Sequence, residues 1–120
     1  MSKADQLRLL DYLEHIIGAI EKIYDYIDDL DEVSFLENEL VQDAVIRNFE
    51  IIGEASNNIA KYHKNFAEKY SEIPWIDMYV MRNCIAHSYF SVDLEIVWKT
   101  VQNDLPDLYE KIKIAFSEQK

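Results

Sequence analysis

The sequence predicts an all-α protein, an antiparallel four-helix bundle with an additional short C-terminal helix. Its 120 residues include two glycines and two prolines, too few turn-forming residues for a many-stranded sheet. Hydrophobic residues make up 49% of the chain, which fits a folded domain despite a charged content of 29%. A chain of this length can bury one core, so we expect residues 1–120 to form a single domain.

The first half of the chain predicts two long amphipathic helices. Apolar residues recur at three- and four-residue steps through residues 7–27, and the acidic residues 28–32 end that pattern. Ser34 and Glu37 fit a capping box, which predicts that the second helix starts there and runs to about residue 62. Gly53 interrupts this second helix, where we expect a neighbouring helix to approach closely.

The second half predicts a short helical turn, two further main helices and a final one. Pro74 favours the start of a third helix that runs to about Ala86. Asp93 predicts the N-cap of a fourth helix, and Pro106 separates that helix from the last. The short connections favour an antiparallel bundle.

Composition limits the classes of function. One cysteine cannot form an internal disulfide, and no cysteine and histidine spacing fits zinc, so we expect no metal, no cofactor and a reducing cytoplasm. Acidic residues interrupt the apolar N-terminus, which predicts neither a signal peptide nor a membrane span. The net charge of −11 opposes general nucleic-acid binding, so any such site must be local.

Arg82 and Asn83 in the third helix, and His87 at its C-terminal end, are polar positions in a stretch that is apolar nearly all round and is therefore expected to be buried nearly all round. Buried polar groups need partners. In a structural interpretation, Arg82 pairs with a carboxylate such as Glu54. Asn83 then bonds to backbone, and His87 stabilises the C-terminus of the helix. The residues alone favour this interpretation.

A shared chemical role for Arg82 and His87 meets a geometric obstacle. Five residues separate them, so they lie about 140° apart around a regular helix. If they act together, either the helix ends before His87 and the chain turns back, or a second subunit completes the site.

Residues 82–87, RNCIAH, resemble the R-N-x-x-x-H signature of the HEPN superfamily of small helical domains, many of which are metal-independent ribonucleases. Residues 87–89, HSY, resemble the H-x-Y extension of its HepT-like branch, toxins that pair with a minimal nucleotidyltransferase antitoxin. The resemblance covers essentially the whole chain, and further elements of that branch are matched by residues 52–55, 73–75, 92–98 and 105–106.

The resemblance implies a homodimer in which both motif copies face one cleft. It implies a metal-independent RNA endonuclease toxin of a type II/VII-like toxin–antitoxin pair. His87 would be the acid and base, Arg82 would stabilise charge on the phosphate, and Asn83 would orient the phosphate or hold the loop. Tyr89 would be the residue to which the antitoxin attaches AMP. Glu54 would support the motif arginine.

Two alternatives stay open. The chain could be a non-catalytic helical module that binds nucleotide or target for a partner nucleotidyltransferase, or a purely structural dimerisation bundle. Arg47 and Glu54 share a helix face with Glu50, which is typical of a salt-bridged surface. His15 and His63 are interpreted as surface or packing residues, and Cys84 as a core residue rather than a nucleophile. The acidic balance predicts weak, salt-sensitive RNA binding.

Overall fold

The computed structural model describes residues 2–86 and 93–119, except for the side chains of residues 84–86. The described residues contain helices and no strand, which confirms the all-α prediction. The helices are α1 (Lys3–Ile27), α2 (Glu32–Leu36), α3 (Glu39–Tyr62), α4 (Lys64–Lys69), α5 (Trp75–Ala86), α6 (Leu94–Asn103) and α7 (Leu105–Ser117).

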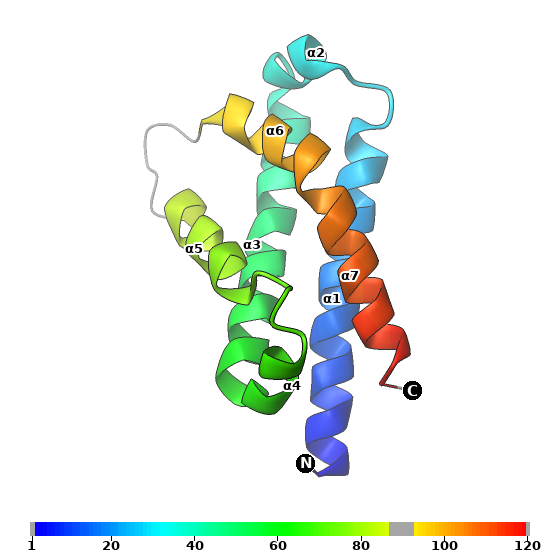
Figure 1. The fold of residues 1–120 in the computed structure, drawn as a ribbon. Coiled ribbons are helices and arrows are strands. Elements are labelled where there is room, and N and C mark those ends of the chain that lie inside the picture. Colours follow the sequence, from blue (N-terminus) through cyan, green and yellow to red (C-terminus); the bar gives the residue numbers. More distant parts are fainter. Residues whose placement is uncertain (1, 87–92, 120) are drawn as a thin grey trace.

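The main helices alternate in direction, as the sequence predicts for an antiparallel bundle. In Figure 1, α1 and α3 run side by side in opposite directions, α5 returns along α3, and α6 and α7 descend together with a bend between them. The bend lies at Asp104 and Pro106, where α7 begins anew. The expected C-terminal helix is α7, which has 13 residues and packs against α1.

Helix starts are set by side-chain caps, and one of them corrects a prediction. Ser34 and Glu37 form no capping box, because Ser34 lies inside the short helix α2. Asp31 caps α2 by accepting a hydrogen bond from the Ser34 amide at 2.8 Å, and Asn38 caps α3 by accepting one from the Val41 amide at 3.1 Å. Two caps in close succession therefore divide what the pattern predicted as one helix.

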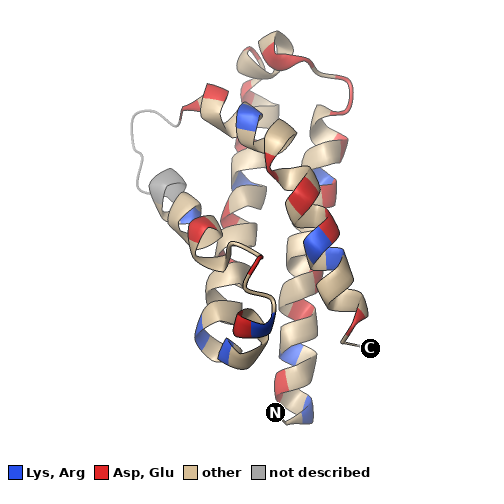
Figure 2. Cartoon of the chain, viewed as in Figure 1, with Lys and Arg blue, Asp and Glu red and all other residues tan. Residues whose placement is uncertain are grey.

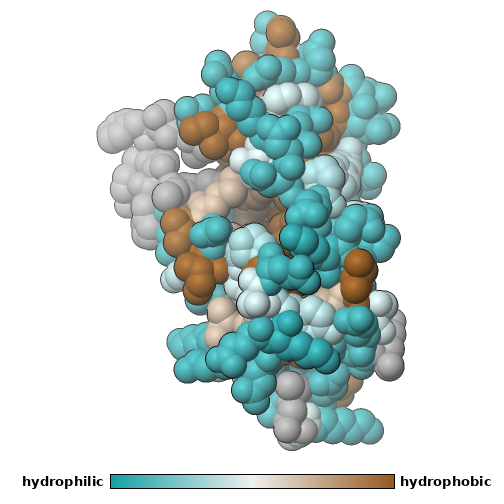
Figure 3. Space-filling view, viewed as in Figure 1, coloured by the Kyte–Doolittle hydropathy of each residue, from teal (hydrophilic) through white to brown (hydrophobic). Residues whose placement is uncertain are grey.

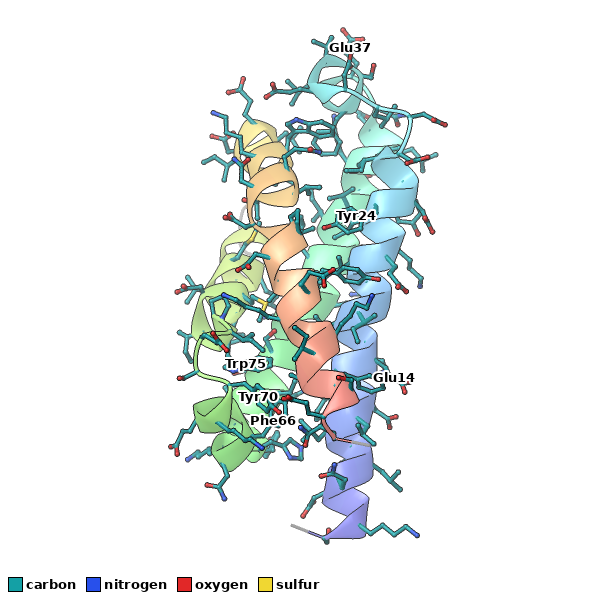
Figure 4. All side chains as sticks on the ribbon, turned by 45° about the vertical axis from the view of Figure 1, so that its right-hand side comes forward. Glu14, Tyr24, Glu37, Phe66, Tyr70 and Trp75 are labelled. Atoms are coloured by element: carbon teal, nitrogen blue, oxygen red, sulfur yellow. The ribbon has the colours of Figure 1, made fainter. Side chains whose placement is uncertain are left out.

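An aromatic cluster fixes the point at which α5 begins. The ring of Phe66 lies 4.7 Å from that of Tyr70 and 6.0 Å from that of Trp75, between ring centroids, and all three side chains lie together in Figure 4. The indole Nε1 of Trp75 donates to the backbone oxygen of Tyr70 at 3.3 Å. Because Trp75 is buried and its N–H is satisfied, the first turn of α5 is anchored to α4.

The outer face of α5 departs from the expectation of near-complete burial. Ile76 is 63% exposed and Val80 is 50% exposed, although Trp75 next to them is buried. Figure 3 shows hydrophobic side chains on the surface over α5. The reason is the position of α5 at one side of the bundle, where its main packing partner is α3. Its hydrophobic residues thus extend onto the surface of the single chain.

None of the helices described combines the length and the apolar character needed to cross a lipid bilayer.

Candidate functional site

The site begins with a close contact between α3 and α5 at Gly53. A Cβ atom at position 53 would overlap the Cβ of Arg82 and lie 2.9 Å from the backbone oxygen of Met78. Glycine at this position thus lets α5 rest on the backbone of α3, which confirms the expected close approach. The contact places Arg82 next to the turn of α3 that carries Glu54.

Two neighbours hold the guanidinium group of Arg82. Its Nη2 lies 3.4 Å from Oε2 of Glu54, and its Nη1 donates to Oδ1 of Asn83 at 2.8 Å. The expected ion pair between Arg82 and Glu54 is therefore present, whereas the Asn83 side chain accepts from Arg82. The side chain of Arg82 is 32% exposed and that of Glu54 is 55% exposed, so the guanidinium can still reach a ligand.

Arg82 lines a cavity of about 450 Å³ between α1, α3 and α5. This cavity is open to solvent and combines aromatic, amide and charged side chains. Arg47 and Glu50 on its wall form an exposed ion pair at 3.7 Å, as the salt-bridge interpretation of that face predicts. The lining residues are Tyr12, His15, Arg47, Glu50, Ile51, Glu54, Ala55, Asn58 and Arg82.

The charge around the cavity is mixed. Figure 2 shows Asp and Glu positions spread over the helices and fewer Lys and Arg positions between them. Arg82 and Arg47 are both paired with carboxylates, which offset their charge. An anionic group bound here would have to compete with those carboxylates for the guanidinium groups, or be held by groups that are not paired.

The chain matches the family model "Ribonuclease HepT-like" over residues 16–115. The chain belongs to the HepT-like family. This bears out the resemblance seen in its motif, and the matched segment contains Glu54, Arg82, Asn83, His87 and Tyr89.

Several curated proteins are similar to the chain over most of its length. A protein of Thermococcus cleftensis named "Probable ribonuclease HepT" is 44% identical over 86% of this chain and 94% of its own. A "Putative RNase" of Methanocaldococcus jannaschii is 35% identical over 96% of this chain and 100% of its own. No solved structure matches the chain.

A second M. jannaschii relative is named "Gamma-glutamylcyclotransferase and putative RNase". It is 45% identical over 84% of this chain. The chain covers only 44% of the length of that relative, so it corresponds to part of that longer protein.

Three of the site residues predicted for this HepT-like chain come together in the structure. Arg82, Asn83 and Glu54 form one connected group, and their roles stay predictions. His87 and Tyr89 lie outside the described residues, as does the side chain of Cys84. His15 is exposed and His63 is buried, which fits the surface and packing roles expected for them.

Sequence reasoning missed the contribution of α1 to the cavity. Tyr12 and His15 reach the neighbourhood of Arg82 only because α1 packs against α3. Asn58 lies one turn beyond Glu54 on α3, and its i, i+4 spacing was the one available signal. Among the residues described, no cluster of histidine, cysteine and carboxylate side chains is arranged to hold a metal ion.

Proposed function

We propose that this HepT-like chain is a metal-independent endoribonuclease that acts as a homodimer and as the toxin of a toxin–antitoxin pair. The observation that carries the proposal is the placement of Arg82. Arg82 lies on α5, the helix that bears the start of the R-N-x-x-x-H motif, and it lines the cavity between α1, α3 and α5. Its guanidinium is partly exposed and is held by Glu54 and Asn83. The names of the relatives support the same class of reaction.

The proposed reaction uses the RNA's own 2′-hydroxyl as the nucleophile. A neutral His87 imidazole accepts the hydroxyl proton while the 2′-oxygen forms a bond to phosphorus. The bond from phosphorus to the 5′-oxygen breaks, and the protonated His87 of a second subunit gives its proton to that oxygen. The products are a 2′,3′-cyclic phosphate and a free 5′-hydroxyl. Arg82 stabilises the negative charge that grows on the non-bridging oxygens, and Asn83 orients the guanidinium.

The exposed stripe on α5 supports the homodimer. Ile76, Val80 and Asn83 follow one another at four- and three-residue steps and so lie on one side of the helix. Exposed hydrophobic side chains beside a motif residue suit an interface between two copies of α5. A two-fold axis there would bring the two motif copies together, which would supply the second histidine that one chain lacks.

The antitoxin belongs to the same proposal. A nucleotidyltransferase partner would attach AMP to Tyr89, two residues after the motif histidine. AMP adds negative charge and bulk next to the position where the RNA phosphate must bind. Both effects oppose substrate binding, so the modification would switch the nuclease off.

The test is cleavage of RNA by the purified protein in the presence of EDTA. We expect a cyclic phosphate end, detected by mass spectrometry, and loss of cleavage in the His87→Ala and Arg82→Ala variants. Arg8→Ala is the matched control, because Arg8 is exposed on α1 and does not line the cavity.

Cleavage that persists in His87→Ala would contradict the mechanism. Absence of cleavage together with binding of a nucleotidyltransferase would favour the non-catalytic module instead. The proposed inactivation is tested by co-expression with such a partner. We expect the mass of the peptide that contains Tyr89 to increase by one AMP group, and we expect the modified protein to lose cleavage.

A further inference from the structure

The helix bundle is open on the side between α5 and α7. Helix α5 packs on α3, and α7 packs on α1 and α6, but among the residues described α5 makes no extensive contact with α6 or α7. Accordingly, α3 is visible between α5 and α7 in Figure 1. In a closed four-helix bundle the helices pack around the core on all sides. One side of this core is therefore left uncovered by the helices described.

A cavity of about 390 Å³ lies in this opening. Figure 3 shows a hollow between the surfaces over α5 and α7, with hydrophobic side chains inside it. We call this cavity the α5–α7 groove. Its size lies within the range of about 300 to 1,000 Å³ that is typical of ligand-binding cavities. The apolar side chains that line it include Phe49, Ile52, Met78, Met81, Leu105 and Leu108.

Two methionines form the α5 wall of the groove. Met78 and Met81 are half-buried, whereas the apolar residues that α3 and α7 contribute are buried. The sulfur of Met78 accepts a hydrogen bond from Oγ of Ser56 at 3.6 Å, which holds one of the two side chains in place. Unbranched methionine side chains adapt their shape to an apolar ligand. An apolar side chain inserted here would therefore remove methionine surface from water.

The mouth of the groove is negatively charged. Asp77 on α5, Asp104 at the bend before α7 and Asp107 on α7 line it, and all three are exposed. Asp107 pairs with Lys111 at 2.9 Å. Among the residues described, Asp77 and Asp104 take part in no ion pair and no side-chain hydrogen bond, and no lysine or arginine lines the groove. Two unpaired carboxylates thus flank an apolar interior.

This combination selects among possible occupants. Carboxylates at the mouth repel nucleic acid and other polyanions, and a second copy of the chain brings the same acidic mouth and a net charge of −11. An apolar ligand without charge would leave both carboxylates unused. A segment that carries apolar side chains on one face and cations beside them satisfies both features. Amphipathic helices bind hydrophobic grooves in this manner, and charge at the rim selects their flanking residues.

We infer that the α5–α7 groove binds a basic amphipathic helix of a partner protein. Large apolar side chains of that helix enter the groove beside Met78, Met81 and Leu108. Lysine or arginine side chains next to them pair with Asp77 and Asp104. Arg82 lies about 100° around α5 from Met81, so the groove and the Arg82 cavity can be occupied at the same time. The inference does not rest on the proposed ribonuclease function.

The probe is a synthetic helical peptide of about 14 residues, with leucine on one face and lysine on the other. Binding is followed through the methyl signals of ¹³C-labelled methionine. The chain has three methionines and two of them line the groove, so the spectrum is simple, and Met78→Leu and Met81→Leu assign it. The peptide should shift the signals of both residues. A peptide with glutamine in place of leucine should shift neither, and one with glutamate in place of lysine should bind at least about tenfold more weakly.

Asn103→Trp tests the apolar contact. Asn103 is an exposed residue that lines the groove at the end of α6, so a tryptophan there occupies the space that the peptide needs. The variant should bind the leucine–lysine peptide about ten- to a hundredfold more weakly, as loss of one buried apolar side chain does. Gln102→Trp is the matched control, because Gln102 is exposed on the same helix and does not line the groove. Thermal unfolding checks that both variants fold.

The double variant Asp77→Asn, Asp104→Asn tests the charge. Its affinity for the leucine–lysine peptide should fall about tenfold, because two exposed ion pairs are lost. Asp25→Asn with Asp29→Asn removes the same charge at exposed positions away from the groove. This control should keep the wild-type affinity, which separates pairing at the groove from general attraction to an acidic protein.

Four outcomes would overturn the inference. The peptide could leave the Met78 and Met81 signals of wild type unchanged, or bind Asn103→Trp as tightly as wild type. Equal binding of the glutamate peptide would remove the basic partner. Signals that move with protein concentration alone would show that a second copy covers the groove. The titrations contain no RNA, so each outcome leaves the ribonuclease proposal to its own test.

Discussion

Gly53 of α3 and the Cβ of Arg82 on α5 occupy adjoining positions with no space for a further carbon atom between them. The guanidinium of the same arginine reaches Glu54, the next residue of α3. One turn of α3 thus fixes both the base and the tip of the Arg82 side chain. Arginine carries several rotatable bonds, so holding it at two points lowers the entropy that it loses on binding a phosphate.

Gly53→Ala should therefore destabilise the fold, although alanine normally favours a helix. The added carbon forces α5 away from α3, and overpacking of this kind costs about 1 to 3 kcal/mol. Gly18→Ala is the matched control, since its Cβ meets open space, and it should stabilise by about 0.5 to 1 kcal/mol. Urea unfolding of both variants measures the difference. Equal effects would mean that the contact is not tight.

Glu54→Gln should separate positioning from stability. The ion pair with Arg82 is partly exposed, so its loss should change the free energy of unfolding by no more than about 1 kcal/mol. RNA cleavage should fall about ten- to a hundredfold, because a shift of about 1 Å in a catalytic group has effects of this size. Asp107→Asn, which removes the ion pair with Lys111 on α7, should leave cleavage unchanged. If Glu54→Gln and Asp107→Asn both lost activity, the loss would not be specific to the positioning of Arg82.

The exposed stripe on α5 predicts the oligomeric state. Ile76→Glu and Val80→Glu would each place a charge in the proposed interface, and we expect sedimentation velocity to show monomers in place of dimers. RNA cleavage should be lost together with the dimer. Ile114→Glu on α7 is the control, because Ile114 is 55% exposed and lies on another helix. A dimer that survives both α5 changes would place the interface elsewhere.

His63 should make the stability depend on pH. Burial lowers the pKa of His63 below its usual value; Asp5 opposes this change and Arg8 adds to it. The unfolded chain then binds the proton more tightly than the folded one, so stability is complete above about pH 6.5 and declines as the pH falls below it. One such group contributes at most about 1.4 kcal/mol per pH unit.

His63→Phe tests this dependence. Phenylalanine keeps a ring beside Tyr12, 6.0 Å away between centroids, and has no titrating nitrogen. Urea unfolding at pH 5.5 and 7.5 should show a smaller difference for this variant than for wild type. Gln102→Leu, at an exposed position on α6, should retain the wild-type difference. A variant as pH-sensitive as wild type would assign the effect to other groups.

Tyr109 connects α7 to α1, and its ionisation should lower the stability of the fold at alkaline pH. Its hydroxyl donates to Oε2 of Glu21 at 2.6 Å, and this bond raises the pKa of Tyr109 to about 12. Because the folded state holds the proton more tightly, the stabilisation is present below pH 10 and is lost as the pH rises toward 12. Tyr109→Phe should cost about 0.5 to 1 kcal/mol at pH 7 and less at pH 11. Thermal unfolding at both pH values, with Tyr26→Phe as control, measures this.

Local signals predicted most of the helices. Pro74 precedes the first residue of α5, and Asp93 accepts hydrogen bonds from the amides of Glu95 and Ile96, as its sequence position indicated. The predicted start of the second long helix was wrong. Ser34 and Glu37 fit a capping motif, but Asp31 caps α2 and Asn38 caps α3 instead. Short-range hydrogen-bond patterns compete, and the sequence does not reveal which cap prevails.

The parts of the site that were predictable are the close helix contact at Gly53 and the ion pair of Arg82. Gly53 indicated the close approach of a neighbouring helix, without showing which one, and the expected burial of Arg82 indicated a carboxylate partner such as Glu54. The cavity that Arg82 lines was not predictable, because Tyr12 and His15 reach it only through the packing of α1 against α3. Burial of α5 was overestimated because an apolar helix pattern does not show which side of the helix its neighbours cover, and Ile76 and Val80 lie on an uncovered side of the single chain.

The contact at Gly53 has a consequence for protein engineering. The Cβ of Arg82 packs against the backbone of α3 at Gly53. A backbone cannot change its shape to fit a different neighbour as side chains can. If α5 alone were transplanted onto a foreign scaffold, the scaffold would therefore contain the arginine but would not hold its side chain in the same position. The smallest portable unit is the pair of helices together, with the glycine and the glutamate that follows it kept in register.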